Sequence, residues 1–375
     1  MKILYGVQGT GNGHITRARV MQKELSRSGI QVDWVFSGRP ENNYFDMDCF
    51  GNYRTYRGLT FVINNGKINH LKTASQLHFR QLWKDINSLD LSQYNLVLND
   101  FDPVTAWAAK KQKVTAIGLS HQNAFHYNIP KKNNNLITDL VMKWFAPVSL
   151  PIGVHWHHFN SLIMPPIIET SPSVDKNPNH ILVYFPFQSL ENLITLVKPF
   201  SSYQFYIYHD VKEPIDDGHI HIRPFSRTGF HKDLQATAGV ICGAGFELPS
   251  EALQLGKKLL VQPVAGQMEQ TSNALALQQL NLATACDNFN HEVLSQWLSN
   301  NGAGDSNYRV YPNTAKAVVD WLTTLPKSHT NSFNVSELKH SLEPLVESLW
   351  QQCGEKKSVN RCRNSDTAPQ GSPST

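Results

Sequence analysis

The stretch GVICGAGFELPSEALQLGKKLLVQPVAGQMEQTSNA, residues 239–274, gives the clearest indication of the fold. It begins with an apolar run that ends in glycines, and a helical pattern follows over 246–255. A second apolar run over 258–264 and a second helical pattern over 267–280 complete the unit. Strands that alternate with helices are typical of parallel sheets, so this segment predicts a strand–helix–strand–helix unit of an α/β domain.

The same alternation runs along the rest of the chain. The length of 375 residues suits two domains of ordinary size. Helices are expected from about His14 and from Pro103 to Lys111, where proline suits the first helical position. The expected strands outside the opening segment cover residues 2–7, 32–37, 94–100, 114–120, 180–186, 203–209 and 220–225. Two successive α/β halves predict two Rossmann-like domains, each built on a parallel sheet.

The domain boundaries follow from composition. The run 164–179 is rich in proline and has no periodicity, so it predicts a linker. An N-terminal domain of residues 1–163 and a C-terminal domain of residues 180–352 are expected on either side of it. Amphipathic patterns over 313–324 and 335–352 are expected to form helices that close the C-terminal domain.

The bulk composition narrows the class of protein. The formal net charge is +4, with 34 basic and 30 acidic residues evenly scattered, which argues against a nucleic-acid binder. Five cysteines without CxxC spacing favour reduced thiols in a cytosolic protein over disulfides or zinc. No signal-peptide pattern and no apolar run of about 20 residues is found, so a cytoplasmic location is expected. The polar, Ser/Pro-rich tail 353–375 is expected to be disordered.

A glycine-rich loop, GVQGTGNGH (6–14), links the first strand to the first helix. The dinucleotide fingerprint needs glycine where His14 stands, and a Walker A loop needs lysine where Asn12 stands, so neither is satisfied. What remains is a strand-to-helix turn that can hold an anion or polar ligand. The positive end of the helix dipole favours a neutral imidazole, so His14 is a candidate general base, or else a histidine that bonds loop carbonyls. The candidate ligand-binding residues of this turn are Gly9, Gly11, Asn12 and Gly13.

The segment 239–274 also carries a resemblance to a known family. Gly245, the pair Ser250-Glu251, Gln270 and the pair Asn273-Ala274 fall in the register of the sugar-nucleotide half of GT-B glycosyltransferases. The chain is most similar to the peptidoglycan N-acetylglucosaminyltransferase class and to related bacterial and archaeal glycosyltransferases.

The chain departs from that family's pattern in places. Ala244 replaces a serine, Glu269 replaces the first of two glutamines, and one residue is missing after Pro263. On the acceptor side, GTGNGH (9–14) resembles the family's glycine-rich loop but is one residue longer. SHQNA (120–124) resembles a His-Glu-Gln-Asn-Gly stretch, of which two residues are kept.

The resemblance implies a GT-B fold, in which two Rossmann-like domains face each other across a cleft. It implies transfer of a sugar from a nucleotide donor, expected to be UDP-linked, to an acceptor hydroxyl, with no cofactor besides this co-substrate. The implied donor-binding residues are Phe225 near the base, Glu251 on the ribose, and Gly243, Ala244, Gly245, Phe246, Ser250, Glu269 and Gln270. The implied acceptor-binding residues are Gly9, Gly11, Asn12, Gly13, Asp100, His121, Gln122 and Asn123. A core aromatic at Phe225 and a solvated carboxylate at Glu251 are the alternatives.

The expected mechanism is a direct displacement at the anomeric carbon. His14 takes the acceptor proton, and the amino end of helix 246–255 stabilises the departing diphosphate. A single base without a facing carboxylate predicts inversion, and no metal is expected. His121 and His126 remain alternative bases.

Two further motifs could bind a metal, but a structural role is favoured for both. In DFD (100–102), Asp102 precedes Pro103 and is expected to cap a helix, while Asp100 lines the cleft. HWHH (155–158) has no accompanying cysteine or carboxylate cluster, so packing or lining of the cleft is favoured over zinc binding.

Several alternatives stay open from the sequence. Besides a glycosyltransferase, the chain could be a sugar-nucleotide 2-epimerase, which shares the fold. The third hypothesis is a non-catalytic nucleotide-sugar-binding protein. The apolar stretch 136–153, with Lys143 and Trp144, fits a buried helix or a membrane interface that would suit a lipid-linked acceptor and peripheral binding at the inner face of the cell membrane. A cell-envelope polysaccharide would then be the expected destination of the sugar.

Overall fold

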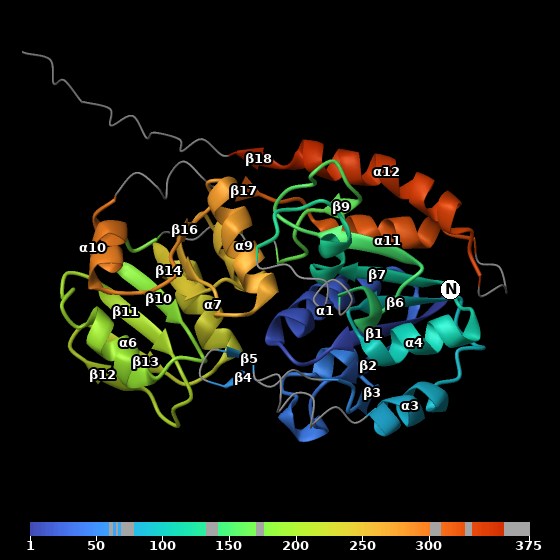
Figure 1. Cartoon of the computed structure of the whole chain (residues 1–375), viewed down its shortest axis with the longest axis horizontal. Helices are drawn as coiled ribbons and strands as arrows, with labels where there is room; N and C mark the ends of the chain where they lie inside the picture. Colours follow the sequence, from blue (N-terminus) through green and yellow to red (C-terminus); the bar gives the residue numbers. More distant parts are fainter. Residues whose placement is uncertain are drawn as a thin grey trace, which may run out of the picture.

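The computed structural model of this protein describes residues 1–59, 63–64, 67–68, 79–132, 142–169, 176–300, 309–326 and 332–355. Two α/β halves lie side by side, each built on a seven-stranded sheet (Figure 1). The two-sheet α/β architecture predicted from the alternation of strands and helices is therefore confirmed.

The first sheet has the order β3-β2-β1-β6-β7-β8-β9, and each neighbouring pair is parallel. Its strands are β1 (Lys2–Gln8), β2 (Gln31–Ser37), β3 (Tyr53–Tyr56), β6 (Leu96–Asp100), β7 (Ala116–Ser120), β8 (Leu150–Val154) and β9 (Ile163–Met164). The helices of this half are α1 (Asn12–Leu25), α3 (Phe79–Ser88) and α4 (Pro103–Gln112), with 3-10 turns η1 (Glu41–Asn43), η2 (Asp48–Phe50) and η3 (Gln122–His126) and a hairpin of β4 (Ile63–Asn64) and β5 (Lys67–Ile68).

Alternating residues of β1 explain why helices cover both faces of this sheet. Tyr5 packs into the core that contains α1, where its ring stacks on Trp34 with centroids 4.6 Å apart. Leu4 points to the opposite face and packs with residues of α3 and α4. Because successive side chains of a strand point to opposite faces, an apolar strand such as β1 needs cover on both.

The second sheet has the order β12-β13-β11-β10-β14-β15-β16 and is parallel except for the edge strand β12. Its strands are β10 (His180–Tyr184), β11 (Gln204–Tyr208), β12 (Ile215–Asp217), β13 (Ile220–Arg223), β14 (Gly239–Gly243), β15 (Lys258–Gln262) and β16 (Thr284–Ala285). Its helices are α6 (Leu190–Val197), α7 (Arg227–Ala236), α8 (Glu247–Gln254), α9 (Met268–Gln279) and α10 (His291–Ser299). In both sheets the carboxyl ends of the parallel strands share one edge, and the loops that follow them converge there.

The last two helices differ from the expectation. We expected α11 (Thr314–Thr324) and α12 (Val335–Gln352) to close the C-terminal domain, but both pack against the N-terminal half (Figure 1). Asn313 Nδ2 donates to Glu24 Oε1 at 3.0 Å, and Trp350 Nε1 donates to the carbonyl oxygen of Ile163 at 2.7 Å. An amphipathic pattern tells that a helix has one apolar face, but it does not tell which sheet that face covers.

Three predicted segment boundaries also differ from those in the structure. The stretch 136–153, interpreted as helical, ends in strand β8, and its residues 136–141 lie outside the described part of the chain. Met164, expected to open the linker, lies in β9, and residues 165–168 are buried; linker residues 170–175 lie outside the described residues. Strand β18 (Gly354–Glu355), in the tail expected to be disordered, pairs with β17 (Arg309–Val310). The tail beyond it lies outside the described residues.

Candidate functional site

A histidine–aspartate pair occupies the carboxyl edge of the first sheet. His14 lies in the first turn of α1, and Asp100 is the last residue of β6, beside β1. His14 Nδ1 is 2.7 Å from Asp100 Oδ1. An ionised carboxylate can only accept a hydrogen bond, so Nδ1 carries a proton and, in the neutral form of the ring, Nε2 keeps a free lone pair. The side chain of His14 is 14% exposed and that of Asp100 is fully buried.

Arg17 holds the same carboxylate from the other side. Its Nε donates to Asp100 Oδ2 at 2.7 Å, and its NH2 group donates to Oδ1 at 2.8 Å, which makes a two-point contact. Burial raises the pKa of Asp100, but Arg17 and then His14 oppose it, and the net pKa lies below its usual value. Asp100 is therefore an ionised, fully engaged partner of His14, and not the acceptor-contacting residue that we expected.

The guanidinium of Arg17 also reaches the C-terminal half. Its NH1 group donates to Oε1 of Glu247, the first residue of α8. Burial, followed by repulsion from Asp100 and other carboxylates, raises the pKa of Glu247 to about 8, although Arg17 opposes the shift. The same guanidinium gives two hydrogen bonds to Asp100 and one to Glu247, so it offsets the burial of Glu247 only in part.

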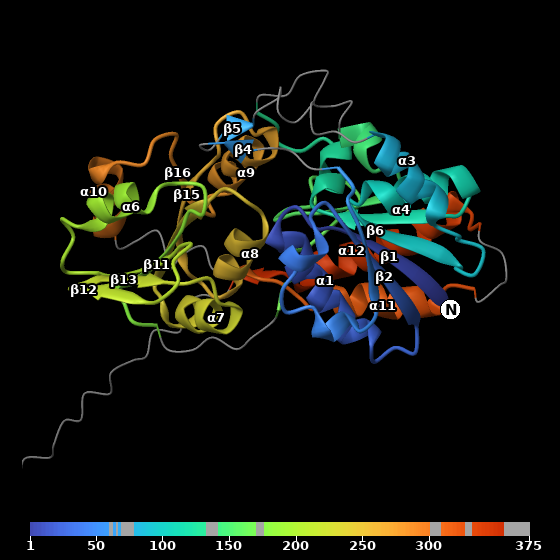
Figure 2. The same ribbon diagram turned by 90° about the horizontal axis from the view of Figure 1, so that it is seen from below.

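Helix α1 and helix α8 meet directly at this point (Figure 2). A Cβ atom on Gly13 would lie 2.7 Å from Cγ of Glu247, so the absence of a side chain at Gly13 permits the contact. The glycine-rich loop of the first half is thus packed against the start of a helix in the second half.

The turn between β14 and α8 has the features of an anion site. Gly243 and Gly245 flank it, and a Cβ on Gly245 would have no atom within 4 Å. No side chain caps the amino end of α8, and the first N–H groups of a helix have no acceptor within it. Open space beside unsatisfied donors suits a negatively charged group.

Two expected donor-binding side chains remain accessible. The side chain of Phe225, just after β13, is 50% exposed, and its ring meets Tyr184 edge-on. Glu251 lies one turn into α8 and is half-buried. Burial and then Glu169 raise the pKa of Glu251 to about 7, while Arg227 opposes the shift.

Gln122 and Glu269 bring the two halves together at a second place. Gln122 Nε2 is 3.2 Å from each carboxylate oxygen of Glu269, at the start of α9. The Oε1 atom of Gln122 is buried and has no hydrogen-bond partner within the described part of the chain. The neighbouring Gln270 turns back instead, because its Oε1 accepts from the N–H of Val264 at 3.0 Å.

Three expected ligand-binding side chains turn out to serve the structure. Ser250 is fully buried: its hydroxyl donates to the carbonyl oxygen of Phe246 at 2.7 Å and accepts from Trp156 Nε1 at 2.8 Å. Ala244 is fully buried, and its carbonyl oxygen accepts from Asn273 Nδ2 at 3.1 Å. The ring of Phe246 is 5% exposed, so only its main chain faces the turn.

His121 is also unsuited to the role expected for it. It is 1% exposed, its Nδ1 lies 2.9 Å from the carbonyl oxygen of Val154, and its Nε2 lies 2.8 Å from Asn273 Oδ1. Its ring stacks on Phe246 with centroids 4.1 Å apart. Burial lowers its pKa. With both nitrogens occupied, His121 joins the two halves and cannot replace His14 as base.

The remaining acceptor-side residues divide between surface and core. Gly11 is the exposed N-cap of α1, and exposed Asn12 accepts from Arg39 at 3.1 Å. The N–H of Gly9 donates to Ser37, while Asn123 is 1% exposed and its N–H donates to Ser120 Oγ. Of these four residues, only Gly11 and Asn12 are exposed.

The two motifs with a metal reading hold protein partners instead. Asp102 caps α4 as predicted, because its carboxylate accepts from the N–H of Thr105 at 2.7 Å. In HWHH, His155 Nδ1 accepts from the N–H of Trp156 at 2.8 Å, and His157 Nδ1 accepts from that of Phe159 at 2.9 Å.

Sequence reasoning missed Arg17 and Glu247. The signal for Arg17 was its position three residues after His14, on the same face of the helix. Glu247 had no local signal, because its partner lies 230 positions away in the chain.

Solved structures of similar fold include glycosyltransferases. The glycosyltransferase SnogD from Streptomyces nogalater is 12% identical, with a TM-score of 0.54 over 91% of this chain and 99% of that one. Acinetobacter baumannii MurG is 16% identical, with a TM-score of 0.54 over 86% and 99% of the chains. Arabidopsis thaliana UGT89C1 complexed with UDP is 12% identical, with a TM-score of 0.53 over 93% and 99%. At these identities the likeness establishes the fold, and that fold is GT-B, as predicted.

A comparison of the sequence with family models shows the family to which the chain belongs. The model of glycosyl transferase family 1 matches residues 1–301, which is most of the chain. The protein therefore belongs to glycosyl transferase family 1. No curated protein sequence matches the chain.

Proposed function

We propose that this protein transfers a sugar from a nucleoside diphosphate donor to an acceptor hydroxyl. The observation that carries the proposal is that Arg17 bonds both to Asp100, the partner of His14, and to Glu247. Glu247 is the first residue of α8, the helix whose start is proposed to bind the donor. A base on one half and an anion-binding turn on the other are the two parts that a displacement at an anomeric carbon needs.

The proposed reaction is a single displacement. His14 Nε2 takes the hydroxyl proton as the acceptor oxygen bonds to the anomeric carbon, and the bond from that carbon to the phosphate oxygen breaks. The electron pair leaves with the nucleoside diphosphate, which the N–H groups at the start of α8 stabilise. Asp100 holds the imidazole in the required tautomer and stabilises its protonated form. The expected product has inverted configuration, and no metal takes part in the proposed steps.

The donor is proposed to be UDP-linked. UGT89C1 and LpCGTa, two of the similar structures, are complexes with UDP. In the proposed arrangement the half-exposed Phe225 meets the base, Glu251 binds the ribose hydroxyls and Glu269 contacts the sugar. Hydroxyl groups that donate to the carboxylate of Glu251 would stabilise its ionised form against the burial that raises its pKa.

Gly245→Val tests the donor site. The space beside Gly245 is open, so valine fits the folded chain but fills the turn. The variant is expected to lose the rise in melting temperature that a UDP-sugar gives the wild-type protein. Gly354→Val, at a second open glycine, in strand β18, is the control. An equal rise in Gly245→Val and wild type would refute the assignment of the turn.

Incubation with UDP-sugars separates this function from its alternatives. A transferase releases UDP and forms a glycoside only when an acceptor is present, whereas a 2-epimerase converts the sugar nucleotide without one. A non-catalytic protein binds the donor and changes neither. Determination of the anomeric configuration of the product by NMR tests inversion, and a retained configuration would contradict the role of His14.

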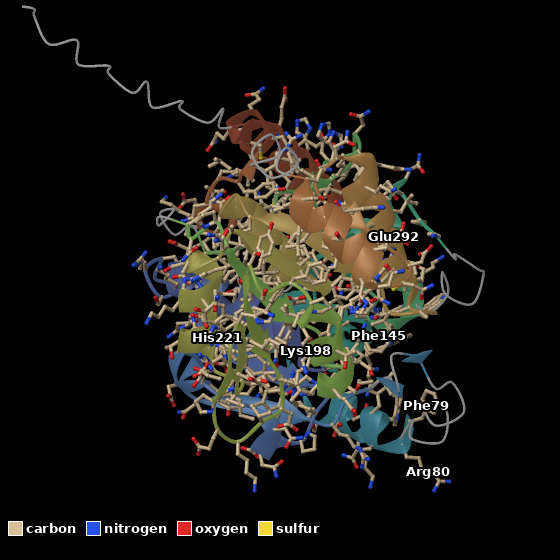
Figure 3. All side chains as sticks on the ribbon, turned by 90° about the vertical axis from the view of Figure 1, so that its left-hand side faces the viewer. Phe79, Arg80, Phe145, Lys198, His221 and Glu292 are labelled. Atoms are coloured by element: carbon tan, nitrogen blue, oxygen red, sulfur yellow. The ribbon has the colours of Figure 1, made fainter. Side chains whose placement is uncertain are left out.

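We also propose that the acceptor is lipid-linked and that one face of the N-terminal half rests on a membrane. In the described part of the chain, no helix has the length and apolar content needed to cross a bilayer. On the face formed by α3, α4 and the residues near Trp144, large apolar side chains are exposed: Phe79 63%, Trp83 58% and Trp144 45%. Phe79 projects outward from α3 beside Arg80 (Figure 3).

Basic side chains surround these rings. Lys110 Nζ lies 4.9 Å from the ring centroid of Trp107 and 4.4 Å from that of Trp144, and Lys111 Nζ lies 5.5 Å from that of Trp83. Aromatic rings with adjacent lysines suit the headgroup region of an anionic bilayer.

Flotation with vesicles tests the membrane surface. Binding is expected with phosphatidylglycerol vesicles, to weaken in salt, and to fall about tenfold in Trp83→Ala/Trp144→Ala. Ile215→Ala, at an exposed residue on the edge strand of the other sheet, is the control. Equal binding by the double variant and the control would refute this surface.

A further inference from the structure

Arg17 contacts both the His14–Asp100 pair and helix α8, whose start is proposed to bind the donor. Its guanidinium contacts Asp100 at two points, approaches His14 Nδ1 to 3.1 Å and donates to Glu247. The side chain is 1% exposed, so these contacts replace water completely. A buried cation with partners on both halves joins them at the site of the proposed chemistry.

The two contacts of Arg17 are unequal. Asp100 belongs to the same half as Arg17 and receives two hydrogen bonds, so this contact does not cross between the halves. Glu247 belongs to the other half, receives one bond from Arg17, and its Oε2 atom is buried without a partner among the described residues. The raised pKa of Glu247 agrees with a carboxylate that is incompletely neutralised. The contact with Glu247 is therefore the weaker one, and it is the one that must break if the halves separate.

We propose that Arg17 is a positioning residue that couples closure of the two halves to the orientation of His14. Glu247, at the start of α8, is the latch: its bond to Arg17 holds the two halves together at this point. The inference rests on the proposed function, because it concerns the same site. When the halves close, Glu247 docks against Gly13 and Arg17, and the start of α8 is brought to the loop that carries His14. A donor held by that helix is then placed before the base.

Substitutions at both residues test the coupling. Arg17→Lys keeps the charge but cannot make the two-point contact, so kcat is expected to fall about 10²-fold with little change in donor KM. Glu247→Ala removes the latch and is expected to raise donor KM as well as lower kcat, because closure then costs more of the binding energy of the donor. Lys23→Ala, which removes an exposed contact of α1 with Glu169, is the matched control.

Hydrogen exchange at the first turn of α8 measures the latch without any activity. Arg17→Ala and Glu247→Ala are each expected to speed this exchange about tenfold, and the double variant no more than either single one, because both remove one shared contact. Unchanged exchange in both variants, additive effects, or an equal effect of Lys23→Ala would overturn the latch.

The outcomes separate the two proposals. If the wild-type protein transfers no sugar from any nucleotide donor, the proposed function fails, and the exchange measurement still decides the latch. If the wild-type protein is active and folded Arg17→Lys retains its kcat, the positioning role of Arg17 is overturned. Free guanidinium that restores the kcat of Arg17→Ala would support that role, because a merely structural loss is not reversed by the missing group.

Discussion

Replacement of Asp100 by asparagine tests the proposed role of the His14–Asp100 pair. The carboxylate accepts three hydrogen bonds: one at Oδ2 from Arg17, and two at Oδ1 from Arg17 and His14. Asparagine has nearly the same shape but only one oxygen. If that oxygen keeps the bond to Arg17 Nε, the amide NH2 group faces His14 Nδ1. His14 must then accept at Nδ1 and carry its proton on Nε2, where it cannot act as a base.

The expected loss follows from this change of tautomer. We expect kcat to fall by about 10³–10⁴-fold, equivalent to about 4–5.5 kcal/mol of activation free energy. The fold is also affected, because removal of one partner from a buried ion pair costs about 3–5 kcal/mol out of a total stability of about 5–15 kcal/mol. The activity must therefore be compared on protein shown to be folded.

The assay is release of UDP from a UDP-sugar in the presence of acceptor, with circular dichroism and a melting curve for each variant. Asp102→Asn is the matched control, since Asp102 is equally buried and close in sequence but caps α4, a position that asparagine also fills. The control is expected to retain its kcat. A folded Asp100→Asn protein with more than about a tenth of the wild-type kcat would refute the assignment of His14 and Asp100.

Three further outcomes are expected. The pKa values of Glu247 and Glu251 in the folded state are about 8 and about 7, and both exceed the unfolded value of about 4.3. At pH values between the unfolded and the folded pKa, the folded state therefore binds more protons than the unfolded state. The free energy of unfolding should then fall as the pH rises from about 4.3 to about 8; denaturant titrations in which Glu247→Gln shows the same slope as wild type would contradict this. Gly13→Ala is expected to lower kcat about tenfold through the clash with Glu247, whereas Gly354→Ala, at an open glycine outside the site, is not; equal rates would remove the need for close approach. Ser250→Ala is expected to lose about 1–3 kcal/mol of stability with donor KM unchanged, because it leaves Trp156 Nε1 unpaired, and a large rise in KM would return Ser250 to the donor site.

Much of the fold could be predicted from the sequence because it depends on local patterns. The helix predicted over 103–111 is α4, and Asp102 caps it as expected. The segment 239–274 forms β14, α8, β15 and α9 within a residue or two of prediction. Strand β8 was missed because it is short, contains Pro151, and follows an apolar stretch without a turn signal.

The sequence by itself determined the two α/β halves, the glycine-rich turns at the ends of their strands, and the position of His14 in a first helical turn. Those features depend on residues that are neighbours along the chain, where periodicity and turn chemistry act. Only the tertiary structure decided that Asp100 lies beside His14, that Ser250 and His121 are buried, and that α11 and α12 pack against the N-terminal half. These outcomes depend on contacts between residues distant in sequence, as between Arg17 and Glu247, and no local pattern encodes which buried groups will meet.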